Sequence, residues 1–352
     1  IVFMFAYYQN LRKEISVRQE WLETVLTREK KWILENQGPE GEIYMNGSKA
    51  GDVNPYFACM AALGLLAETK NCPMTETEQK AVGRYLDWHT GVLLETDGKM
   101  GIYRKENGKL IYKEKADSED GYLGMYLFLM GKYLGKTENT DLPESWKKGI
   151  SLALKKIQSL MRDGITQVSE ENTTAYLMDN LEVWKGLHEL ELAGLEDTQA
   201  ISEMRNKLQA QIEKLFWDDA NQRWRIIGNS DLYDQTEFYP DGVAQIYPLI
   251  YEFPVKEKKK QKILYDQFTE KFQWQKLNKK RNGFLWAMTG MAAAQMGDIN
   301  NLVELIGNYE TEYCENRKYP LYTGEAGWIC MECEKLYKLY ERKIKTGFIL
   351  CA

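Results

Sequence analysis

The segments between the predicted helices alternate in length along the chain, and this alternation constrains the fold more than any other feature. Apolar residues recur every three or four positions, and Gly, Pro, Asn and Asp separate the periodic stretches, which is typical of α-helices and their ends. This pattern predicts twelve helices, at residues 17–35, 54–69, 75–93, 118–135, 143–161, 173–194, 197–217, 239–251, 256–271, 284–296, 299–315 and 324–344. The links into odd-numbered helices are short, whereas those into even-numbered helices are long: 36–53, 94–117, 162–172, 218–238, 272–283 and 316–323.

Short turns join helices into antiparallel pairs, and a closed ring of six pairs places every long link on one face. The even-numbered helices are also the more apolar, as expected for an inner ring, while residues 143–161 and 256–271 have Lys-rich faces suited to an outer ring. We therefore predict an all-α fold, an (α/α)6 toroid of six helical hairpins. An α-solenoid is the alternative, but no repeat of about 34 or 40 residues is present and the loops are unequal.

Several predicted helix ends have local signals. Asn54-Pro55 places a cap residue before a proline, and the spacing of Thr75 and Glu78 fits a capping box. Gly135, Gly194 and Gly297 lie where helices are expected to stop.

We expect a single domain over residues 17–345, preceded by an N-terminal segment at 1–16 and followed by a tail at 346–352. Residues 1–8 are apolar, so they fit either the end of a signal or membrane anchor or a helix packed on the domain. No other segment approaches about 20 consecutive apolar residues, so we predict that the body is not embedded in a membrane. We expect a monomer located outside the cytoplasm or at the cell surface.

The composition argues against several functional classes. The net charge is −6, whereas a nucleic-acid-binding protein should present a basic face. The chain has six cysteines and two histidines, and its single CxxC, from Cys330 to Cys333, lacks the second ligand pair that zinc requires. We therefore expect neither a metal nor a cofactor.

Acidic residues recur beside aromatic residues where the inner helices should begin, and so on one predicted face. Carboxylates bind sugar hydroxyls and perform acid–base chemistry, while aromatic rings stack on sugar rings. The candidates in chain order are Glu40, Glu42 and Tyr44; Asp117, Asp120 and Tyr122; Tyr176, Asp179, Asn180 and Trp184; Tyr239 and Asp241; and Glu325 and Trp328.

Helix capping offers a simpler explanation for some of these acids. Asp117, Asp120, Asp241 and Glu325 all fall near the start of a predicted helix, where an acid interacts favourably with the helix dipole. Asp179 lies within an apolar helical stretch beside Met178 and Leu181, so its burial would require a partner or a function.

Five segments carry a resemblance to a known superfamily: PYFACMAALGLL, DSEDGYLGMYLFL, YLMDNLEVWKGL, FYPDGVAQIYP and GEAGW. In their order and spacing, from about residue 21 to residue 337, the chain resembles six-hairpin glycosidases. Within that superfamily it is similar to bacterial proteins of the family 8 glycoside hydrolase-like group, some of which are associated with exopolysaccharide.

The resemblance implies an inverting hydrolase of β-linked polysaccharide. The general acid of family 8 is a Glu in a Ser-Glu-Gly context, which corresponds here to Pro39-Glu40-Gly41-Glu42; Glu40 matches the Glu-Gly pair, and Glu42 is the preferred candidate. The Asp that touches the sugar at the cleavage point corresponds to Asp117 or Asp120. The catalytic base corresponds to Asp241, with Asp234 as the second choice.

The leading hypothesis is therefore a glycoside hydrolase with a carbohydrate substrate, in which Asp117, Asp120 and Asp179 hold the central sugar. A toroid that binds glycans without cutting them is the second hypothesis. A sugar epimerase or polysaccharide lyase of the same fold is the third, although the scarcity of histidines disfavours the epimerase and the acidic face disfavours the anionic substrate of a lyase.

Overall fold

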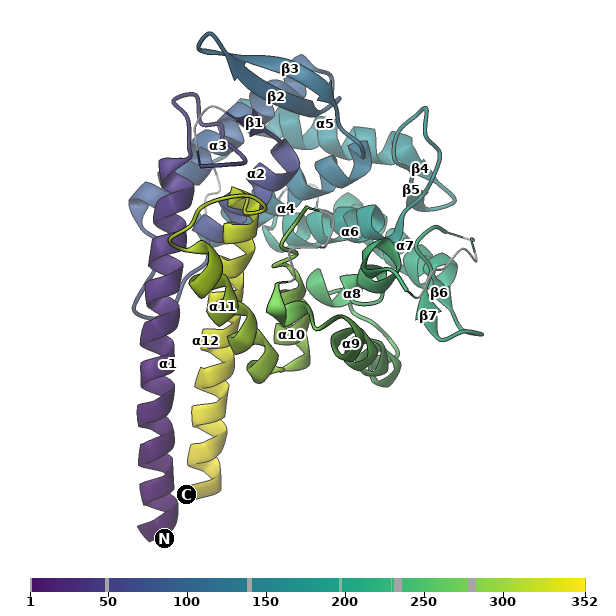
Figure 1. The fold of residues 1–352 in the computed structure, drawn as a ribbon. Helices are drawn as coiled ribbons and strands as arrows, with labels where there is room; N and C mark the ends of the chain where they lie inside the picture. Colours follow the sequence, from purple (N-terminus) through teal and green to yellow (C-terminus); the bar gives the residue numbers. More distant parts are fainter. Residues whose placement is uncertain are drawn as a thin grey trace.

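A computed structural model of the chain describes residues 2–47, 51–137, 141–195, 198–228, 230, 236–277 and 283–351. Helices dominate it (Figure 1). They are α1 (Val2–Glu35), α2 (Pro55–Leu65), α3 (Glu76–Glu95), α4 (Glu119–Thr137), α5 (Glu144–Leu160), α6 (Leu177–Leu192), α7 (Thr198–Phe216), α8 (Tyr247–Ile250), α9 (Lys258–Phe272), α10 (Thr289–Met296), α11 (Ile299–Tyr313) and α12 (Thr323–Cys351), with a π-turn at Phe238–Gly242 and a 3-10 turn at Trp274–Lys276.

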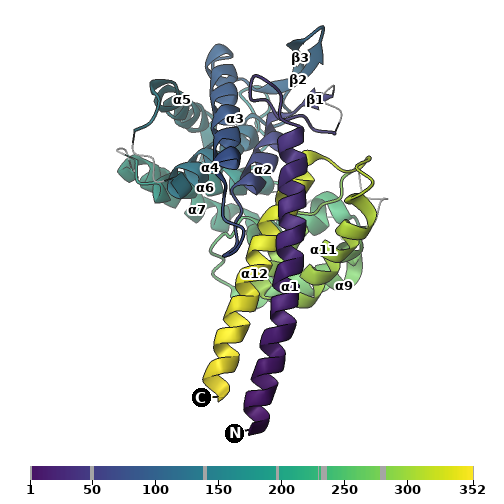
Figure 2. The same cartoon turned by 90° about the vertical axis from the view of Figure 1, so that its left-hand side faces the viewer.

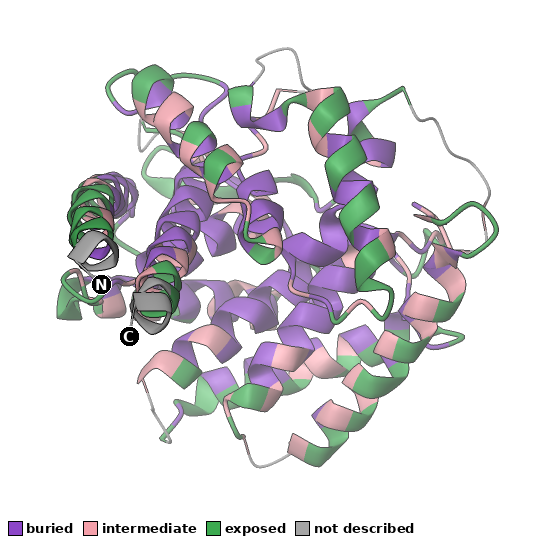
Figure 3. Ribbon diagram, turned by 90° about the horizontal axis from the view of Figure 1, so that it is seen from below, coloured by how far each residue is buried: buried purple, intermediate pink, exposed green. Residues whose placement is uncertain are grey.

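The six even-numbered helices form a closed inner ring. Each of them contacts the next, from α2 through α4, α6, α8 and α10 to α12, and α12 packs back against α2. Viewed from below, these inner helices are largely buried, whereas the surrounding odd-numbered helices expose one face (Figure 3). A solenoid would leave its first and last inner helices apart, so the contact between α2 and α12 confirms the predicted (α/α)6 toroid.

Glycines allow the inner helices to approach very closely. A Cβ atom at Gly327 of α12 would lie 2.1 Å from the backbone oxygen of Met60 in α2, and one at Gly64 would lie 2.4 Å from Cα of Gly327. The α4–α6 contact has the same character, because a Cβ at Gly186 would lie 2.4 Å from the backbone oxygen of Gly124. These glycines allow α2 to pack closely on α12, and α4 on α6.

Most of the predicted helix ends are confirmed. Asn54 accepts a hydrogen bond from the backbone N–H of Tyr56, Thr75 and Glu78 form a capping box, and Gly297 ends α10 with φ at 70°. Gly135 does not stop its helix, because α4 continues to Thr137.

Two predicted inner helices differ from the structure. The predicted helix at 239–251 is a π-turn followed by the short α8, since Pro248 lacks the N–H that a continuous helix would need. The predicted helix at 284–296 begins only at Thr289, because Trp286 has a left-handed backbone with φ at 58°. Both irregular segments pass through the face where the long links gather.

The long links contain short antiparallel strands that the sequence did not signal. The second link folds into a hairpin of β2 (Gly101–Glu106) and β3 (Lys109–Lys115), to which β1 (Asp52–Val53) adds an edge. This sheet stands above the start of the inner helices (Figure 1). Two further ribbons pair β4 (Met161–Arg162) with β5 (Ile165–Thr166), and β6 (Trp217–Asp218) with β7 (Arg223–Trp224).

The first and last helices extend beyond the ring. Helix α1 begins at Val2, so residues 2–16 of the predicted N-terminal segment are part of the first helix, and α12 continues to Cys351. The two helices lie side by side and project away from the body on the side opposite the β2–β3 hairpin (Figures 1 and 2). Among the described residues, no helix combines the length and apolarity needed to cross a lipid bilayer.

Candidate active site

A cavity of about 660 Å³ opens among the N-terminal ends of the inner helices. Its walls come from the long links and the first turns of α2, α4, α6 and α12, together with the β2–β3 hairpin. The lining combines aromatic rings, methionines and acids: Met45, Asp52, Asn54, Tyr56, Phe57, Met60, Ile102, Glu114, Lys115, Asp117, Ser118, Tyr122, Met178, Asp179, Glu182, Tyr239, Tyr247, Phe284, Trp286, Met288, Glu325 and Trp328.

Glu182 of α6 is the most deeply buried acid in this lining, with 1% of its surface exposed. Its Oε1 accepts hydrogen bonds from the hydroxyl groups of Tyr56 at 2.5 Å, Tyr247 at 2.8 Å and Tyr251 at 3.2 Å. Its Oε2 is buried and has no hydrogen-bond partner in the described protein. Burial raises the pKa of Glu182 to about 8, although the three tyrosine hydroxyls oppose that rise. Glu182 is therefore largely protonated at neutral pH.

Asp179 lies one turn before Glu182 on the same face of α6, because residues three apart are neighbours on a helix. Asp179 Oδ1 and Glu182 Oε2 lie 3.2 and 2.8 Å from the same point, the position of a Cβ at Gly121, so they are within about 6 Å of each other. The pKa of Asp179 is raised well above its usual range, first by burial and then by the neighbouring acids Asp120 and Glu182. The glycine at position 121 leaves room for both acids against α4.

Asp120, the acid that acts on Asp179 electrostatically, is fully buried. Its carboxylate accepts hydrogen bonds from Thr166 Oγ1 at 2.7 Å, Ser118 Oγ at 2.9 Å and its neighbour's backbone N–H, that of Gly121, at 3.0 Å. Burial raises the pKa of Asp120 to about 6, while the bonds from Thr166 and Ser118 act in the opposite direction. Asp120 thus fixes Ser118 and β5 beside α4 without lining the cavity.

Glu325 brings a further acid into the cavity from the first turn of α12. Its oxygens accept hydrogen bonds from the backbone N–H groups of Trp286 at 3.3 Å and Ala287 at 2.9 Å. These bonds hold the left-handed backbone of Trp286, a conformation that persists only when the surroundings stabilise it. Burial raises the pKa of Glu325 to about 7.

Aromatic rings form much of the cavity wall and continue onto the surface. Tyr239 and Trp286 lie 4.9 Å apart between ring centroids, and Phe57 stacks on Phe284 at 5.4 Å. The indole Nε1 atoms of Trp286 and Trp328 are buried donors without a partner in the described protein. Buried donors normally find an acceptor, so these two indoles and Glu182 Oε2 suit a ligand rich in oxygen.

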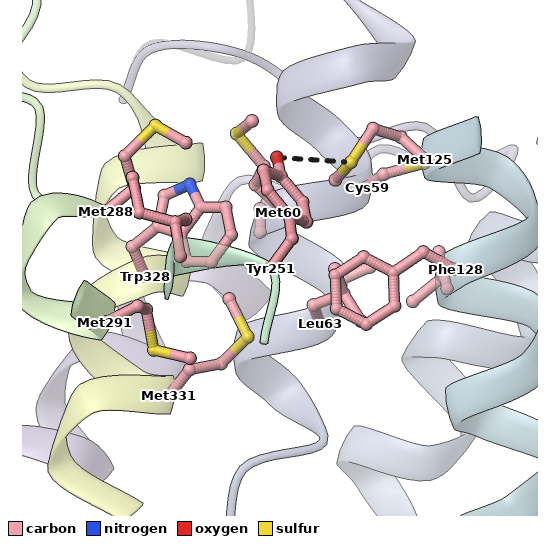
Figure 4. Close-up of a cluster of buried hydrophobic side chains, with 14 of the residues drawn as sticks. Cys59, Met60, Leu63, Met125, Phe128, Tyr251, Met288, Met291, Trp328 and Met331 are labelled. Atoms are coloured by element: carbon pink, nitrogen blue, oxygen red, sulfur yellow. Dashed lines mark hydrogen bonds between the residues drawn. The ribbon is translucent and has the colours of Figure 1, made fainter. Parts of the chain in front are cut away.

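Beneath the cavity the chain is densely packed with sulfur-containing and aromatic side chains (Figure 4). Met60, Met288 and Trp328 line the cavity on this side, and the Tyr251 hydroxyl, which also reaches Glu182, lies 3.7 Å from Met125 Sδ. Further toward the C-terminal ends of the inner helices, Lys185 pairs with Glu189 and Glu252. The cavity is therefore a pocket with a closed base.

Six of the predicted site residues line this cavity: Asp117, Tyr122, Asp179, Tyr239, Glu325 and Trp328. They come from four different inner-helix openings, so the predicted convergence of distant acids and aromatic rings is present for these positions.

The structure does not bring Glu40, Glu42 and Tyr44 to the cavity. Glu42 is buried in a tight turn, where its carboxylate accepts hydrogen bonds from the backbone N–H of Glu40 and from Tyr44 Oη. The same turn packs against the outer helix α3, because Gln37 donates to the backbone oxygens of Gly41 and Ala81. Glu42 thus stabilises the first long link, and Glu40 is exposed on its outer side.

The remaining predicted residues also lie outside the cavity lining. Asn180 exchanges hydrogen bonds with the backbone of Thr166 and so joins α6 to β5. Trp184 is buried against His188 and donates to Gln209, and Tyr176 precedes α6 and pairs with Ile227. Asp241 is buried in the π-turn, and Asp234 lies outside the described residues.

The sequence prediction missed Glu182, Tyr56, Tyr247, Phe284 and Trp286. A signal for Glu182 was present, since it follows Asp179 by three residues in an apolar helix, and Tyr247 and Tyr251 show the same-face spacing of four. Among the described residues, no group of three or more His, Cys, Asp and Glu side chains is arranged to hold a metal ion. Cys330 and Cys333 are buried thiols whose pKa values burial raises, as expected for packing residues.

The fold and the cavity together define an (α/α)6 toroid protein with an acidic, aromatic pocket at the helix N-termini. No protein-family model and no curated protein matches the sequence. Among solved structures, the chain is similar to a glycosidase variant, with a TM-score of 0.64, 12% identity, and coverage of 91% of this chain and 98% of that one.

Two further solved structures show how widely this fold is used. An α-amylase from Clostridium perfringens matches with a TM-score of 0.55 and 13% identity, covering 89% of this chain and 97% of the amylase. A type II terpene cyclase from Scytonema, in complex with geranylgeranyl dihydroxybenzoate, matches with a TM-score of 0.53 and 11% identity over 93% of this chain and 99% of the cyclase. At these identities the likeness extends to the fold, which the glycosidases and the cyclase share with this chain.

Proposed function

We propose that this protein is a glycoside hydrolase that binds a neutral sugar in the cavity. The observation that supports this most is a protonated, partly unpartnered acid, Glu182, in a pocket walled by aromatic rings and unpaired indole N–H groups. Sugars present flat apolar ring faces for stacking and many oxygen acceptors for such donors. The acidic lining disfavours an anionic substrate.

Asp179 is our candidate for the general acid. It reaches the cavity, and burial beside Asp120 and Glu182 raises its pKa, which favours the protonated form that a general acid needs. In the proposed step, Asp179 gives its proton to the glycosidic oxygen as the bond from that oxygen to the anomeric carbon breaks. A water molecule forms the new bond to that carbon, and its proton passes to a second carboxylate.

Glu182 has a different role in this scheme. Because its Oε1 is occupied by three tyrosine hydroxyls, the proton that its raised pKa implies lies on the free Oε2, which is 2.8 Å from the position of a Cβ at Gly121. A neutral carboxylic acid donates a hydrogen bond to a substrate oxygen, and Glu182 would hold the sugar in this way beside Asp179.

Asp117 is our candidate for the base that receives the proton from water. It lines the cavity on its open side, at the end of the link that precedes α4. The nearest acid pair, Asp179 and Glu182, has raised pKa values on both members, which disfavours either as an ionised nucleophile. We therefore propose that water attacks directly and that the anomeric configuration inverts.

This assignment changes the residues proposed from the sequence. The acid role passes from Glu42 to Asp179, because the carboxylate of Glu42 is used within its own turn. The base role passes from Asp241 to Asp117, because Asp241 does not line the cavity. The relation to family 8, the β-linkage and the extracytoplasmic location remain proposals.

Activity should be measured as reducing ends released from a panel of neutral α- and β-linked oligosaccharides and polysaccharides. We expect Asp179→Asn to lower kcat by about 1,000-fold or more and Asp117→Asn by at least about 100-fold, as is usual for general acids and bases. Glu182→Gln keeps a hydrogen-bond donor, so it should lose less activity than Glu182→Ala. The exposed Glu170→Gln, outside the cavity, is the matched control.

Equal activity of wild type and Asp179→Asn would refute the acid assignment, and retention of configuration in the product, followed by NMR, would refute inversion. If the wild type binds glycans on an array but releases no product from any substrate, the protein is a glycan-binding toroid.

A proton-initiated cyclisation of a polyene is a second candidate. It is favoured by the protonated Glu182 beneath aromatic rings, which can stabilise a developing cation. The further acids Asp52, Glu114 and Asp117 at the same cavity are better suited to hydroxyl groups, so we rank it below hydrolysis. Conversion of a prenylated arene, followed by mass spectrometry, tests it.

A further inference from the structure

The projecting ends of α1 and α12 form an arm on the side of the molecule away from the cavity (Figures 1 and 2). We define this arm as residues 2–18 and 341–351. Its tip combines residues 2–6, with the sequence VFMFA, and residues 347–351, with the sequence GFILC. Because both helices continue to the tip, two apolar segments from opposite ends of the chain lie together there.

Basic side chains surround the arm just above its apolar tip. Arg12, Lys13 and Arg18 of α1 and Arg342, Lys343 and Lys345 of α12 are all exposed. None of the six is held in an ion pair within the described chain. The arm carries only two acids, Glu14 and Glu341, so it is basic, whereas the whole chain has a net charge of −6.

Aromatic residues lie between the apolar tip and the basic collar. Tyr7 is 65% exposed, while Tyr8 is buried against the arm with Arg12 over its ring at 5.9 Å. Along the arm, the apolar end is followed by tyrosines and then by exposed Lys and Arg. This order matches the layers of a bilayer, from the acyl chains through the interface to the headgroups.

From this order we propose that the arm binds the surface of a membrane that contains anionic lipids, with its tip inserted among the acyl chains. The proposed insertion is interfacial, with the apolar tip among the acyl chains and the basic side chains at the headgroups. Since the arm projects on the side opposite the β2–β3 hairpin, the bound protein would present its cavity away from the bilayer. The proposal does not depend on the function of the cavity.

The test is flotation of the purified chain with vesicles of phosphatidylcholine alone or with about 30% phosphatidylglycerol. We expect binding to the anionic vesicles that weakens in about 0.5 M NaCl, because salt screens headgroup charges. Replacing Arg12, Lys13, Lys343 and Lys345 by Gln should weaken partitioning at least about tenfold. A triple variant with Phe3→Ser, Phe5→Ser and Ile349→Ser should weaken vesicle binding at both low and high salt, because it removes apolar side chains rather than charges.

The matched control removes four exposed charges elsewhere, through Lys147→Gln, Lys148→Gln, Lys155→Gln and Lys207→Gln on the outer helices α5 and α7. It should bind as the wild type does, and circular dichroism should show every variant folded. Equal losses in the arm and control variants would overturn the proposal, as would failure of the wild type to float. The competing partner is a second copy of the chain, bound at the groove beside Val17 and Trp21. A stable dimer, detected by light scattering, that does not bind vesicles would also overturn the membrane proposal.

Discussion

At the scale of single residues, burial determines the chemistry of the cavity. A carboxylate loses its hydration when it is buried, so it either gains donors or keeps its proton. Glu42 is buried with donors from Glu40 and Tyr44 and serves as a structural link. Glu182 is buried with three donors on one oxygen and none on the other, which leaves a group available to a ligand.

The raised pKa of Glu182 makes a prediction about stability and pH. In the folded protein the pKa of Glu182 is about 8, whereas in the unfolded chain it returns to the ordinary glutamate value of 4.5. Between these values the folded state binds more protons, so Glu182 lowers the free energy of unfolding as pH rises through this window. Between pH 5 and pH 9, the stability of Glu182→Gln relative to wild type should therefore rise by about 4 kcal/mol.

Urea unfolding at both pH values measures this change, with Glu170→Gln as the control in which no such gain is expected. A difference between Glu182→Gln and wild type that is the same at both pH values would show that Glu182 is ionised in the folded protein.

At the scale of secondary-structure elements, the ring depends on helices that touch through glycine. The α2–α12 contact closes the toroid, and in it the backbone of Met60 occupies the space that a side chain at position 327 would need. The same contact places Trp328 and Glu325 against α2 in the cavity. Helix packing and site geometry are therefore coupled.

Gly327→Ala should destabilise the protein by about 2–4 kcal/mol, because its Cβ would lie 2.1 Å from a backbone oxygen that can move only with α2. Gly307→Ala on α11 is the control, since nothing lies within 4 Å of its added Cβ, and it should be neutral or stabilising by up to about 1 kcal/mol. Urea unfolding compares the two. A small loss in Gly327→Ala would show that α2 and α12 separate without cost.

At the scale of the whole molecule, the ring and the arm are distinct parts. The ring closes through contacts among the inner helices, and α1 is tied to it near Glu29, which accepts two hydrogen bonds from Arg317. The arm lies beyond these contacts (Figure 2). Removal of the arm should therefore affect membrane binding more than folding of the ring.

Removal of residues 1–7 together with 347–352 should change the melting temperature by less than about 2 °C, because the ring contacts remain. Removal of residues 1–22 should lower the melting temperature clearly, because it deletes the buried Ile15 and Leu22. Circular dichroism melts measure both. A large drop for the shorter truncation would mean that the tip is part of the folded core.

The sequence by itself determined most of the helices and their order. Periodicity and capping are local properties, so Asn54, the Thr75–Glu78 box and Gly297 could be assigned without knowing any neighbour in space. The alternation of link lengths then predicted the toroid, because short links indicate which helices pair and long links indicate the face on which the loops gather. Asp117, Asp179, Glu325 and Trp328 were found at the cavity for the same reason.

The tertiary structure alone decided which acids share an environment. Glu42 and Glu182 are both acids beside apolar and aromatic residues in the sequence, yet one lies against the outer helix α3 and the other under three tyrosines from α2 and the α8 region. The physical reason is that the rotation of each helix about its axis depends on its contacts, such as Gly124 against Gly186. Those contacts involve residues far apart in the sequence, so no local pattern records them.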